Sequence, residues 1–155
     1  MKIFAIDPGT TKSAWLYMEG GTIQMFEILE NREVLDAVGR LTTDTFLVYE
    51  MFACYGMAVG REVFETVLWT GRFIQAAPCQ VRRLYRRDVK MHLCNSMRAK
   101  DGNVRQAIID RYPPTGGGKI PQIGIQLDPG PLYGVSKDIW SALALAITFK
   151  ETLKP

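Results

Sequence analysis

Residues 2–15 read KIFAIDPGTTKSAW and predict two short strands joined by a turn. The first apolar run ends at Asp7, and the Pro-Gly pair that follows favours a turn. Residues 12–18 are apolar enough to form the second strand. A Gly-Gly pair at 20–21 then predicts a hairpin, and TIQMFEI at 22–28 predicts a third strand. The chain is therefore expected to open as a three-stranded antiparallel meander.

Further along the chain, strand and helix patterns alternate. The expected elements are a helix at 31–41 with Asn31 as its cap, a strand at 46–50, a helix at 60–76, a strand at 79–84, helices at 86–94 and 103–112, and an apolar helix at 136–153. Half of residues 113–134 are proline or glycine, which predicts a long loop. This order predicts an α/β fold in which helices cover a mixed sheet, built as a single domain over residues 1–155.

Composition excludes several classes of protein. The chain has 155 residues, of which 47% are hydrophobic and 23% charged, as in an ordinary globular domain. It contains no apolar run of the roughly 18–20 residues that a membrane span needs, and the early Asp7 argues against a signal peptide. Three scattered cysteines and a single histidine, His92, favour neither a disulfide scaffold nor a zinc site. We expect a cytoplasmic protein.

Positive charge is concentrated in one segment. Residues 82–111 contain nine basic and three acidic side chains, a net charge of +6 in a chain whose total is only +3. Such a segment on a mildly acidic body favours a polyanionic partner, although a solvated helix surface would have the same composition.

Three carboxylates occupy positions that favour a shared site. Asp7 and Glu50 each end a predicted strand, and Asp138 falls in the first turn of the last helix. Residues at the carboxyl ends of neighbouring parallel strands meet at one edge of a sheet. Three such charges would repel one another unless a cation such as Mg²⁺ neutralised them. Taken singly, Asp7 could cap a turn and Asp138 could complement a helix dipole.

Several motifs resemble those of RuvC-type Holliday-junction resolvases, which belong to the ribonuclease H-like superfamily. They are IDPGTTKSAW at 6–15, VYEMF at 48–52, PCQVRR at 78–83, MRAKDGNVRQAIIDRY at 97–112 and KDIWSALALAI at 137–147. PGPLYGVSKD at 129–138 is especially similar to phage-encoded members, which implies the cytoplasm of a host cell. The DPGTT motif alone also occurs in actin-like ATPases, but those enzymes need two such domains.

The resemblance implies a five-stranded mixed sheet flanked by helices, and a homodimer that cuts branched DNA by two-metal phosphodiester hydrolysis. It implies that Asp7, Glu50 and Asp138 hold two Mg²⁺ ions and that Lys100 lies near the scissile phosphate, with no small-molecule cofactor. Cellular members carry a further aspartate where this chain has Ser141. That departure raises three possibilities: three carboxylates suffice, Asp128 compensates, or Mn²⁺ supports more activity than Mg²⁺.

The basic segment and its neighbourhood supply the expected DNA contacts. Phe52 is the expected stacking aromatic, with Tyr55 as the alternative, and the expected backbone contacts are Arg82, Arg83, Arg86, Arg87, Lys90 and Arg105. Two other functions stay open, namely a junction-binding protein with weak or no cleavage and a related nuclease acting on RNA.

The helix at 60–76 carries two apolar faces. We expect the core-facing stripe to comprise Val63, Phe64, Val67, Leu68, Gly71 and Ile74. The second set, Trp69, Phe73 and Ala77, either fills a wide core or forms the dimer interface, with Met51 and Met57 close by in sequence.

Overall fold

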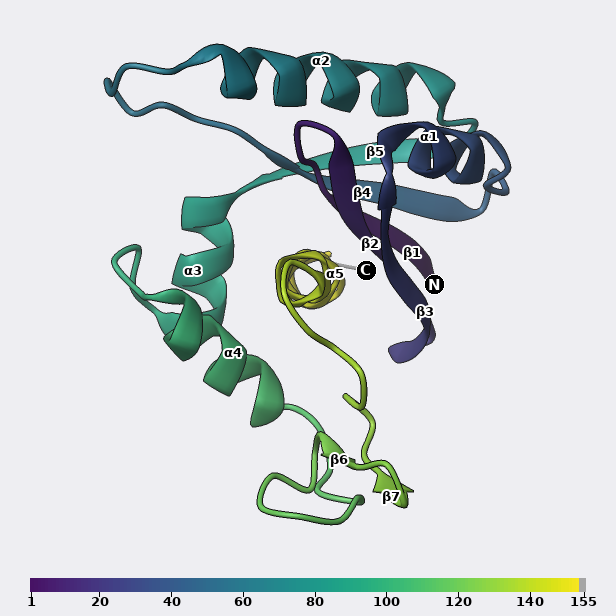
Figure 1. Ribbon diagram of the computed structural model, residues 1–155, viewed down its shortest axis with the longest axis vertical. Coiled ribbons are helices and arrows are strands. Elements are labelled where there is room, and N and C mark those ends of the chain that lie inside the picture. The colour runs from purple at the N-terminus through teal and green to yellow at the C-terminus, as the bar shows by residue number, and fades with distance from the viewer. Residues whose placement is uncertain (154–155) are drawn as a thin grey trace.

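The computed structural model describes residues 1–153 and contains a five-stranded mixed sheet in the order β3-β2-β1-β4-β5 (Figure 1). The pairs β1–β2 and β2–β3 are antiparallel, whereas β1–β4 and β4–β5 are parallel. This topology confirms the predicted α/β fold. The strands are β1 (Lys2–Asp7), β2 (Lys12–Glu19), β3 (Thr22–Glu30), β4 (Thr45–Met51) and β5 (Gln80–Tyr85).

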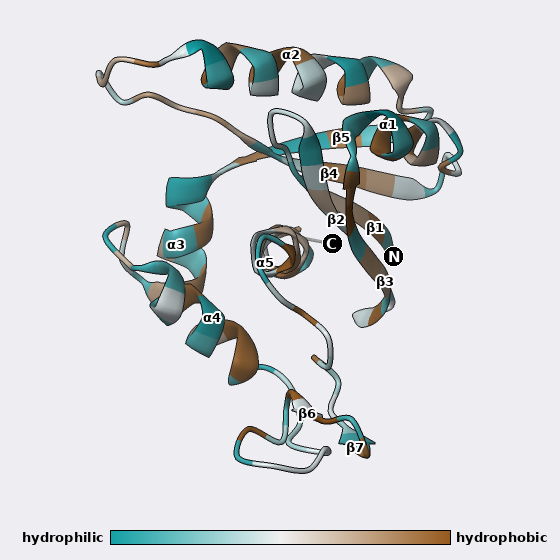
Figure 2. Cartoon of the chain, in the orientation of Figure 1, coloured by the Kyte–Doolittle hydropathy of each residue, from teal (hydrophilic) through white to brown (hydrophobic). Residues whose placement is uncertain are grey.

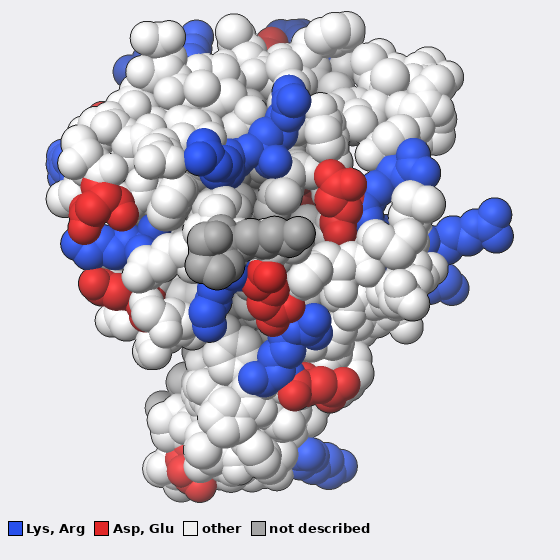
Figure 3. All heavy atoms as spheres, turned by 180° about the vertical axis from the view of Figure 1, so that it is seen from behind, with Lys and Arg blue, Asp and Glu red and all other residues white. Residues whose placement is uncertain are grey.

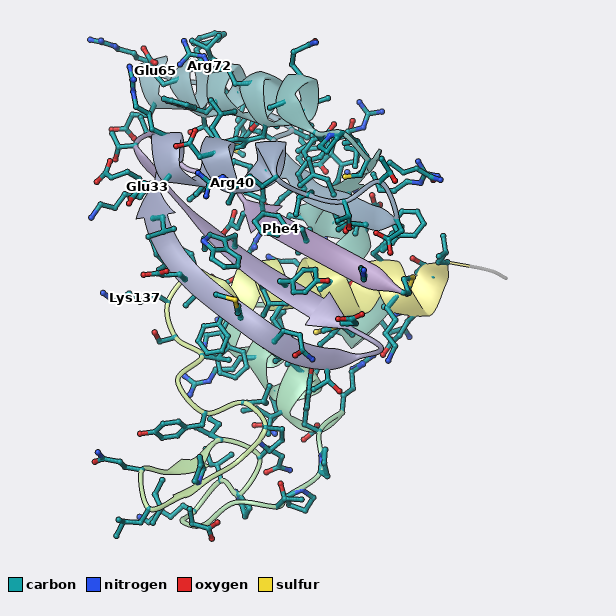
Figure 4. All side chains as sticks on the ribbon, turned by 90° about the vertical axis from the view of Figure 1, so that its right-hand side faces the viewer. Phe4, Glu33, Arg40, Glu65, Arg72 and Lys137 are labelled. Atoms are coloured by element: carbon teal, nitrogen blue, oxygen red, sulfur yellow. The ribbon has the colours of Figure 1, made fainter. Side chains whose placement is uncertain are left out.

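Helices cover both faces of the sheet (Figures 1 and 4). Helices α1 (Asn31–Gly39) and α2 (Arg61–Ala76) lie on one face, and α5 (Ile139–Thr152) lies on the other. Helices α3 (Arg86–Cys94) and α4 (Asp101–Ile109) pack against α5 from the side away from the sheet. As a result, α5 is enclosed between the sheet and this helix pair.

Side-chain alternation along β1 builds two separate cores. Phe4 and Ile6 pack with α1 and α2, whereas Ile3 and Ala5 pack with α5. The helix between the layers is apolar almost all round, and every residue from 142 to 149 is buried (Figure 2). Within residues 1–153, no helix is both long and apolar enough to cross a membrane.

The segment at 113–134, expected to be a loop, forms a compact lobe that projects below the sheet in Figure 1. It contains a short hairpin of β6 (Gly124–Ile125) and β7 (Asp128–Pro129). Gly124 has φ +78°, and a Cβ there would lie 2.1 Å from the Gly130 nitrogen, so these backbones pack too closely for any side chain. At the tip, Leu127 is 93% exposed.

The predicted faces of α2 are reversed. Phe73 is buried, and Trp69 and Ala77 pack against the same core, so this second set fills the core rather than an interface. Phe64 and Leu68, expected in the core, are 66% and 54% exposed.

Asn31 is also not the cap of its helix. Glu30 is the N-cap residue of α1, and the backbone NH of Glu30 donates to the Glu33 carboxylate. Asn31 is instead buried, and its side chain reaches across to the turn after β1.

Candidate active site

Two carboxylates meet where β1 and β4 end. Ile6 pairs with Tyr49 in the parallel ladder, so Asp7 and Glu50 are the next residues on adjacent strands. Alternation along each strand directs both side chains to the α5 face, because Ala5 and Val48 pack there. The geometry predicted from the two strand ends is therefore present in the fold.

The amino end of α5 supplies the third carboxylate. Asp138 is the N-cap residue of α5, yet within residues 1–153 its side chain makes no capping hydrogen bond. Ser141 follows one turn later, close enough to Asp7 to lower the pKa of that carboxyl. The start of α5 therefore lies beside the end of β1.

These charges perturb Asp7 strongly. Burial, together with the nearby charges of Glu50 and Asp138, raises the pKa of Asp7 from 3.8 to about 7. Arg86 and Ser141 act in the opposite direction and only partly offset this rise. At neutral pH without a cation, Asp7 is therefore close to half protonated.

Arg86 forms ion pairs with two carboxylates at this site. Its Nη1 lies 3.4 Å from Glu50 Oε2, and its Nη2 donates to Asp101 Oδ1. Burial raises the pKa of Glu50, and the Arg86 guanidinium works against that rise. The result is a chain of alternating charge, Glu50–Arg86–Asp101, between the end of β4 and the start of α4.

A cavity of about 280 Å³ opens beside this chain, between α3, α4 and α5. Val89, Val104, Trp140 and Ala144 supply its apolar lining. Its charged lining comprises Glu50, Asp101 and Asp138 on the acidic side, and Arg86, Lys90, Arg105 and Lys137 on the basic side. Among the residues described, Asp7 does not line the cavity but interacts electrostatically with three residues that do.

A buried hydrogen-bond network fixes the turn that follows Asp7. The Ser13 hydroxyl donates to Asn31 Oδ1 at 2.6 Å and accepts from the Gly9 NH at 3.1 Å. Asn31 Nδ2 then donates to the Gly9 carbonyl oxygen at 3.0 Å. A Cβ on Gly9 would lie 2.1 Å from the Lys12 carbonyl oxygen, so only glycine fits. This network holds the end of β1, and with it Asp7, against α1.

The donor chemistry of the site fits a hard divalent cation. Burial, together with the charges of Glu50 and Asp138, raises the pKa of Asp7 to about 7, and a bound cation would favour its ionised form. As placed, however, no three His, Cys, Asp or Glu side chains within residues 1–153 are close enough together to form a metal site. Glu50 is paired with the Arg86 guanidinium, which supplies a positive charge where a metal ion would otherwise do so.

The residues expected to contact DNA fall into two groups. Arg86, Lys90 and Arg105 line the cavity, and the Arg105 guanidinium lies 4.9 Å from the centre of the Trp140 ring. The others lie outside it: Phe52 and Tyr55 are exposed beyond β4, Arg87 lies over the Tyr55 ring, and Arg82 and Arg83 lie on the edge strand β5.

Arg82 and Arg83 do not share a surface. They are consecutive residues of β5 and therefore point to opposite faces of the sheet. Arg82 lies near the Phe46 ring, whereas Arg83 lies near the Tyr85 ring. The two guanidinium groups therefore lie on different faces at this edge of the sheet.

Lys100 and Asp128 lie outside the cavity lining. Lys100 is the exposed N-cap residue of α4, and its backbone NH donates to Asn103 Oδ1 at 2.9 Å. It directly precedes the cavity-lining Asp101. Asp128 is exposed on β7 in the lobe and does not compensate for Ser141 in this arrangement.

The sequence analysis missed three of the groups described above. Asp101 directly follows Lys100, and the sequence pattern marks it only as one acidic residue within the basic segment. Trp140 and Lys137 flank Asp138, and Lys137 extends outward from the segment before α5 (Figure 4). Each of these three residues lies within two positions of Lys100 or Asp138 in the sequence, and that proximity is the only feature that could have indicated them.

Charge is distributed differently on the opposite side of the molecule. On the face shown in Figure 3, Lys and Arg side chains are interspersed with Asp and Glu. Arg111, the last member of the basic segment, binds Glu151 of α5 at 3.0 Å, and His92 binds the same carboxylate at 2.6 Å. This part of the segment therefore joins helices α3, α4 and α5.

Comparison with known proteins gives structural matches only. No protein-family model matches the sequence, and no curated protein matches it significantly. The structure of Thermus thermophilus RuvC superposes with a TM-score of 0.66 at 16% identity, covering 97% of this chain and 93% of that chain. T. thermophilus RuvC in complex with a Holliday junction substrate gives a TM-score of 0.61 at 17% identity, with the same coverage. The chain thus has the ribonuclease H-like fold of RuvC, with its five-stranded mixed sheet and flanking helices.

Proposed function

We propose that this chain is a structure-selective endodeoxyribonuclease that cuts four-way or other branched DNA junctions. The observation that carries the proposal is that Glu50 and Asp138 act on the charge of Asp7 at one sheet edge, beside a cavity lined by four basic side chains. The likeness to a RuvC structure that holds a Holliday junction supports branched DNA as the substrate. We further propose a single nuclease domain of the phage-encoded type, acting in the cytoplasm of a host cell.

Asp7, Glu50 and Asp138 would hold the divalent cations, two Mg²⁺ per site or Mn²⁺ in their place. When bound, such cations supply an activated water and stabilise the leaving oxygen of a phosphodiester. Ser141 lies near Asp7 and lowers the pKa of its carboxyl, which favours the ionised form. The turn network of Ser13 keeps Asp7 at a fixed position on the central strand.

The cavity side chains would bind the substrate backbone. Lys90, Arg105 and Lys137 border the carboxylates and can pair with phosphate oxygens. Lys100, one residue before the cavity, would approach the scissile phosphate from the start of α4 and stabilise its developing charge. Phe52 and Tyr55 offer exposed rings on which an unpaired base can stack.

A second candidate is a junction-binding protein with weak cleavage. Two observations favour it: Ser141 replaces a carboxylate with a hydroxyl, and Arg86 already pairs with Glu50. Both features reduce the negative charge available to a cation.

We also propose that two copies form a homodimer through the outer face of α2. Phe64 and Leu68 lie one turn apart there, and both are largely exposed. Met57, in the segment before α2, is 71% exposed and extends the apolar surface. A dimer would present two active sites to the two opposed strands of a junction.

The decisive experiment is a cleavage assay on a synthetic four-way junction, with a linear duplex of the same sequence as control. We expect Mg²⁺- or Mn²⁺-dependent nicking of the junction and little cutting of the duplex. Asp7→Asn should abolish cleavage while junction binding survives in a gel shift, because the amide keeps the shape but removes the charge. An RNA–DNA hybrid tests the alternative substrate. Binding without cleavage in either metal would instead support the second candidate.

A further inference from the structure

Two consecutive arginines at the start of α3 have different environments. Tyr85 of β5 pairs with Met51 of β4, so the next residue, Arg86, begins α3 beside the strand end that carries Glu50. Arg86 reaches inward and contacts Glu50 and Asp101. Arg87 reaches outward, with its guanidinium 4.6 Å from the centre of the Tyr55 ring.

The inward arginine takes part in the charge balance of the carboxylate site. The Arg86 side chain is 38% exposed and the Glu50 side chain 18%, so the pair is only partly hydrated. It also attracts the charge of Asp7, although no direct contact joins the two. Arg86 therefore stabilises the ionised carboxylates when no metal ion is present.

The same contact opposes the binding of a metal ion. While Glu50 Oε2 accepts a hydrogen bond from Arg86 Nη1, part of its negative charge is already neutralised. A divalent cation bound to the same carboxylate would also be repelled by the nearby Arg86 guanidinium. Asp101 provides a second partner on which the guanidinium can remain after it leaves Glu50. Arg86 would therefore keep one carboxylate partner if a cation displaced it from Glu50.

We propose that Arg86 is an internal counter-cation that competes with the divalent cation for Glu50 and so sets the cation concentration at which the site fills. This inference rests on the proposed function, since it takes Asp7, Glu50 and Asp138 as the cation ligands. It assigns Arg86 a role different from that of a simple contact to the DNA backbone.

The test is Mn²⁺ binding to the DNA-free protein, measured by isothermal titration calorimetry. We expect Arg86→Gln to bind Mn²⁺ about tenfold more tightly than the unmodified chain, a change that corresponds to about 1.4 kcal/mol. Arg87→Gln removes the same charge one residue away without touching Glu50, and its affinity should change less than about threefold, since an exposed charge at that distance is screened.

Thermal unfolding separates competition from a purely structural role. In EDTA, Arg86→Gln should be less stable than the unmodified chain, because Glu50 loses its partner. On addition of Mn²⁺ it should gain more stability than the unmodified chain does, since stabilisation follows ligand affinity. Equal losses with and without Mn²⁺ would mean that Arg86 only supports the fold, and the proposal would be overturned.

A charge-balanced variant removes the remaining ambiguity. Arg86→Gln combined with Asp101→Asn keeps the net charge of the chain unchanged. If Arg86 competes directly at Glu50, this double variant still binds Mn²⁺ more tightly than the unmodified chain; a return to the original affinity overturns the proposal. Should Arg86→Gln fail to fold, Arg86→Lys keeps the charge but cannot bridge both carboxylates, and about threefold tighter binding is expected.

The outcomes distinguish this inference from the proposed function. Mn²⁺ binding by the unmodified chain with no gain in Arg86→Gln overturns the role of Arg86 alone. If Arg86→Gln binds Mn²⁺ and the unmodified chain does not, the result supports competition between Arg86 and the cation most strongly. If neither binds Mn²⁺, the cation site itself is wrong and both proposals fail.

Discussion

Asp7→Asn should make the cation-free protein more stable above neutral pH, even though it destroys the proposed activity. The pKa of Asp7 is raised from 3.8 to about 7 in the folded chain, so its ionised form is disfavoured there. Asparagine keeps the size of the side chain and carries no charge. The substitution therefore removes the cost of burying a charge, together with the repulsion of that charge by Glu50 and Asp138.

The magnitude follows from the shift. Below about pH 4 both states keep the proton; between about pH 4 and 7 only the unfolded chain releases it, so the free energy of unfolding falls as pH rises. A shift of roughly 3 pKa units corresponds to up to about 4 kcal/mol above pH 7. For a domain of this size, about 4 kcal/mol corresponds to a rise in Tm of roughly 8–16 °C.

The assay is thermal unfolding at pH 5 and pH 8, in EDTA and in Mg²⁺. In EDTA at pH 8, the Tm of Asp7→Asn should be higher than that of the unmodified chain, and at pH 5 the difference should be smaller. Adding Mg²⁺ should raise the Tm of Asp7→Asn only slightly. Asp44→Asn serves as control: hydrogen bonds from Thr42 and Lys2 lower the pKa of this exposed carboxyl, so its removal should not stabilise the protein at pH 8. A Tm for Asp7→Asn that equals or falls below that of the unmodified chain at pH 8 in EDTA would refute the reasoning.

Four further outcomes are expected. Arg87→Glu should weaken junction binding and lower the slope of log K against log salt by about one, because Arg87 faces outward; an unchanged slope would mean that it contacts no phosphate. Phe64→Ser with Leu68→Ser should give a monomer in light scattering after size exclusion, with unchanged circular dichroism. Ser13→Ala should lower the free energy of unfolding by about 1–3 kcal/mol in urea titrations, because it leaves a buried amide unpaired. Ser141→Asp should lower the half-maximal Mg²⁺ concentration for cleavage; a value that is unchanged or higher would show that the site is not short of charge.

The sheet and its carboxylates could be predicted because their signals are local. Each strand is a short apolar run, and Asp7 and Glu50 interrupt those runs at their ends. Alternation with a period of two then fixes the face to which each side chain points. The order of the strands and the flanking helices followed from the same pattern together with the family resemblance.

The orientation of α2 could not be predicted, because hydrophobicity does not separate its two faces. Thr70 is buried, and it can be so at low cost because its hydroxyl donates to the Thr66 carbonyl oxygen at 2.8 Å within the helix. Phe64 and Leu68, the more apolar residues, are left outside. The Glu50–Arg86 pair was equally inaccessible, since its partners are 36 residues apart and meet only through the pairing of β4 with β5.

The enclosure of α5 has a consequence for how this chain can vary in sequence. Ala142 and Ala146 are 0% exposed and lie between the sheet and the outer helix pair, where no larger side chain fits without moving the helix. Any such movement would carry Asp138 away from Asp7. A larger residue at one of these positions of α5 should therefore be accompanied by a smaller residue on the strand or helix that faces it.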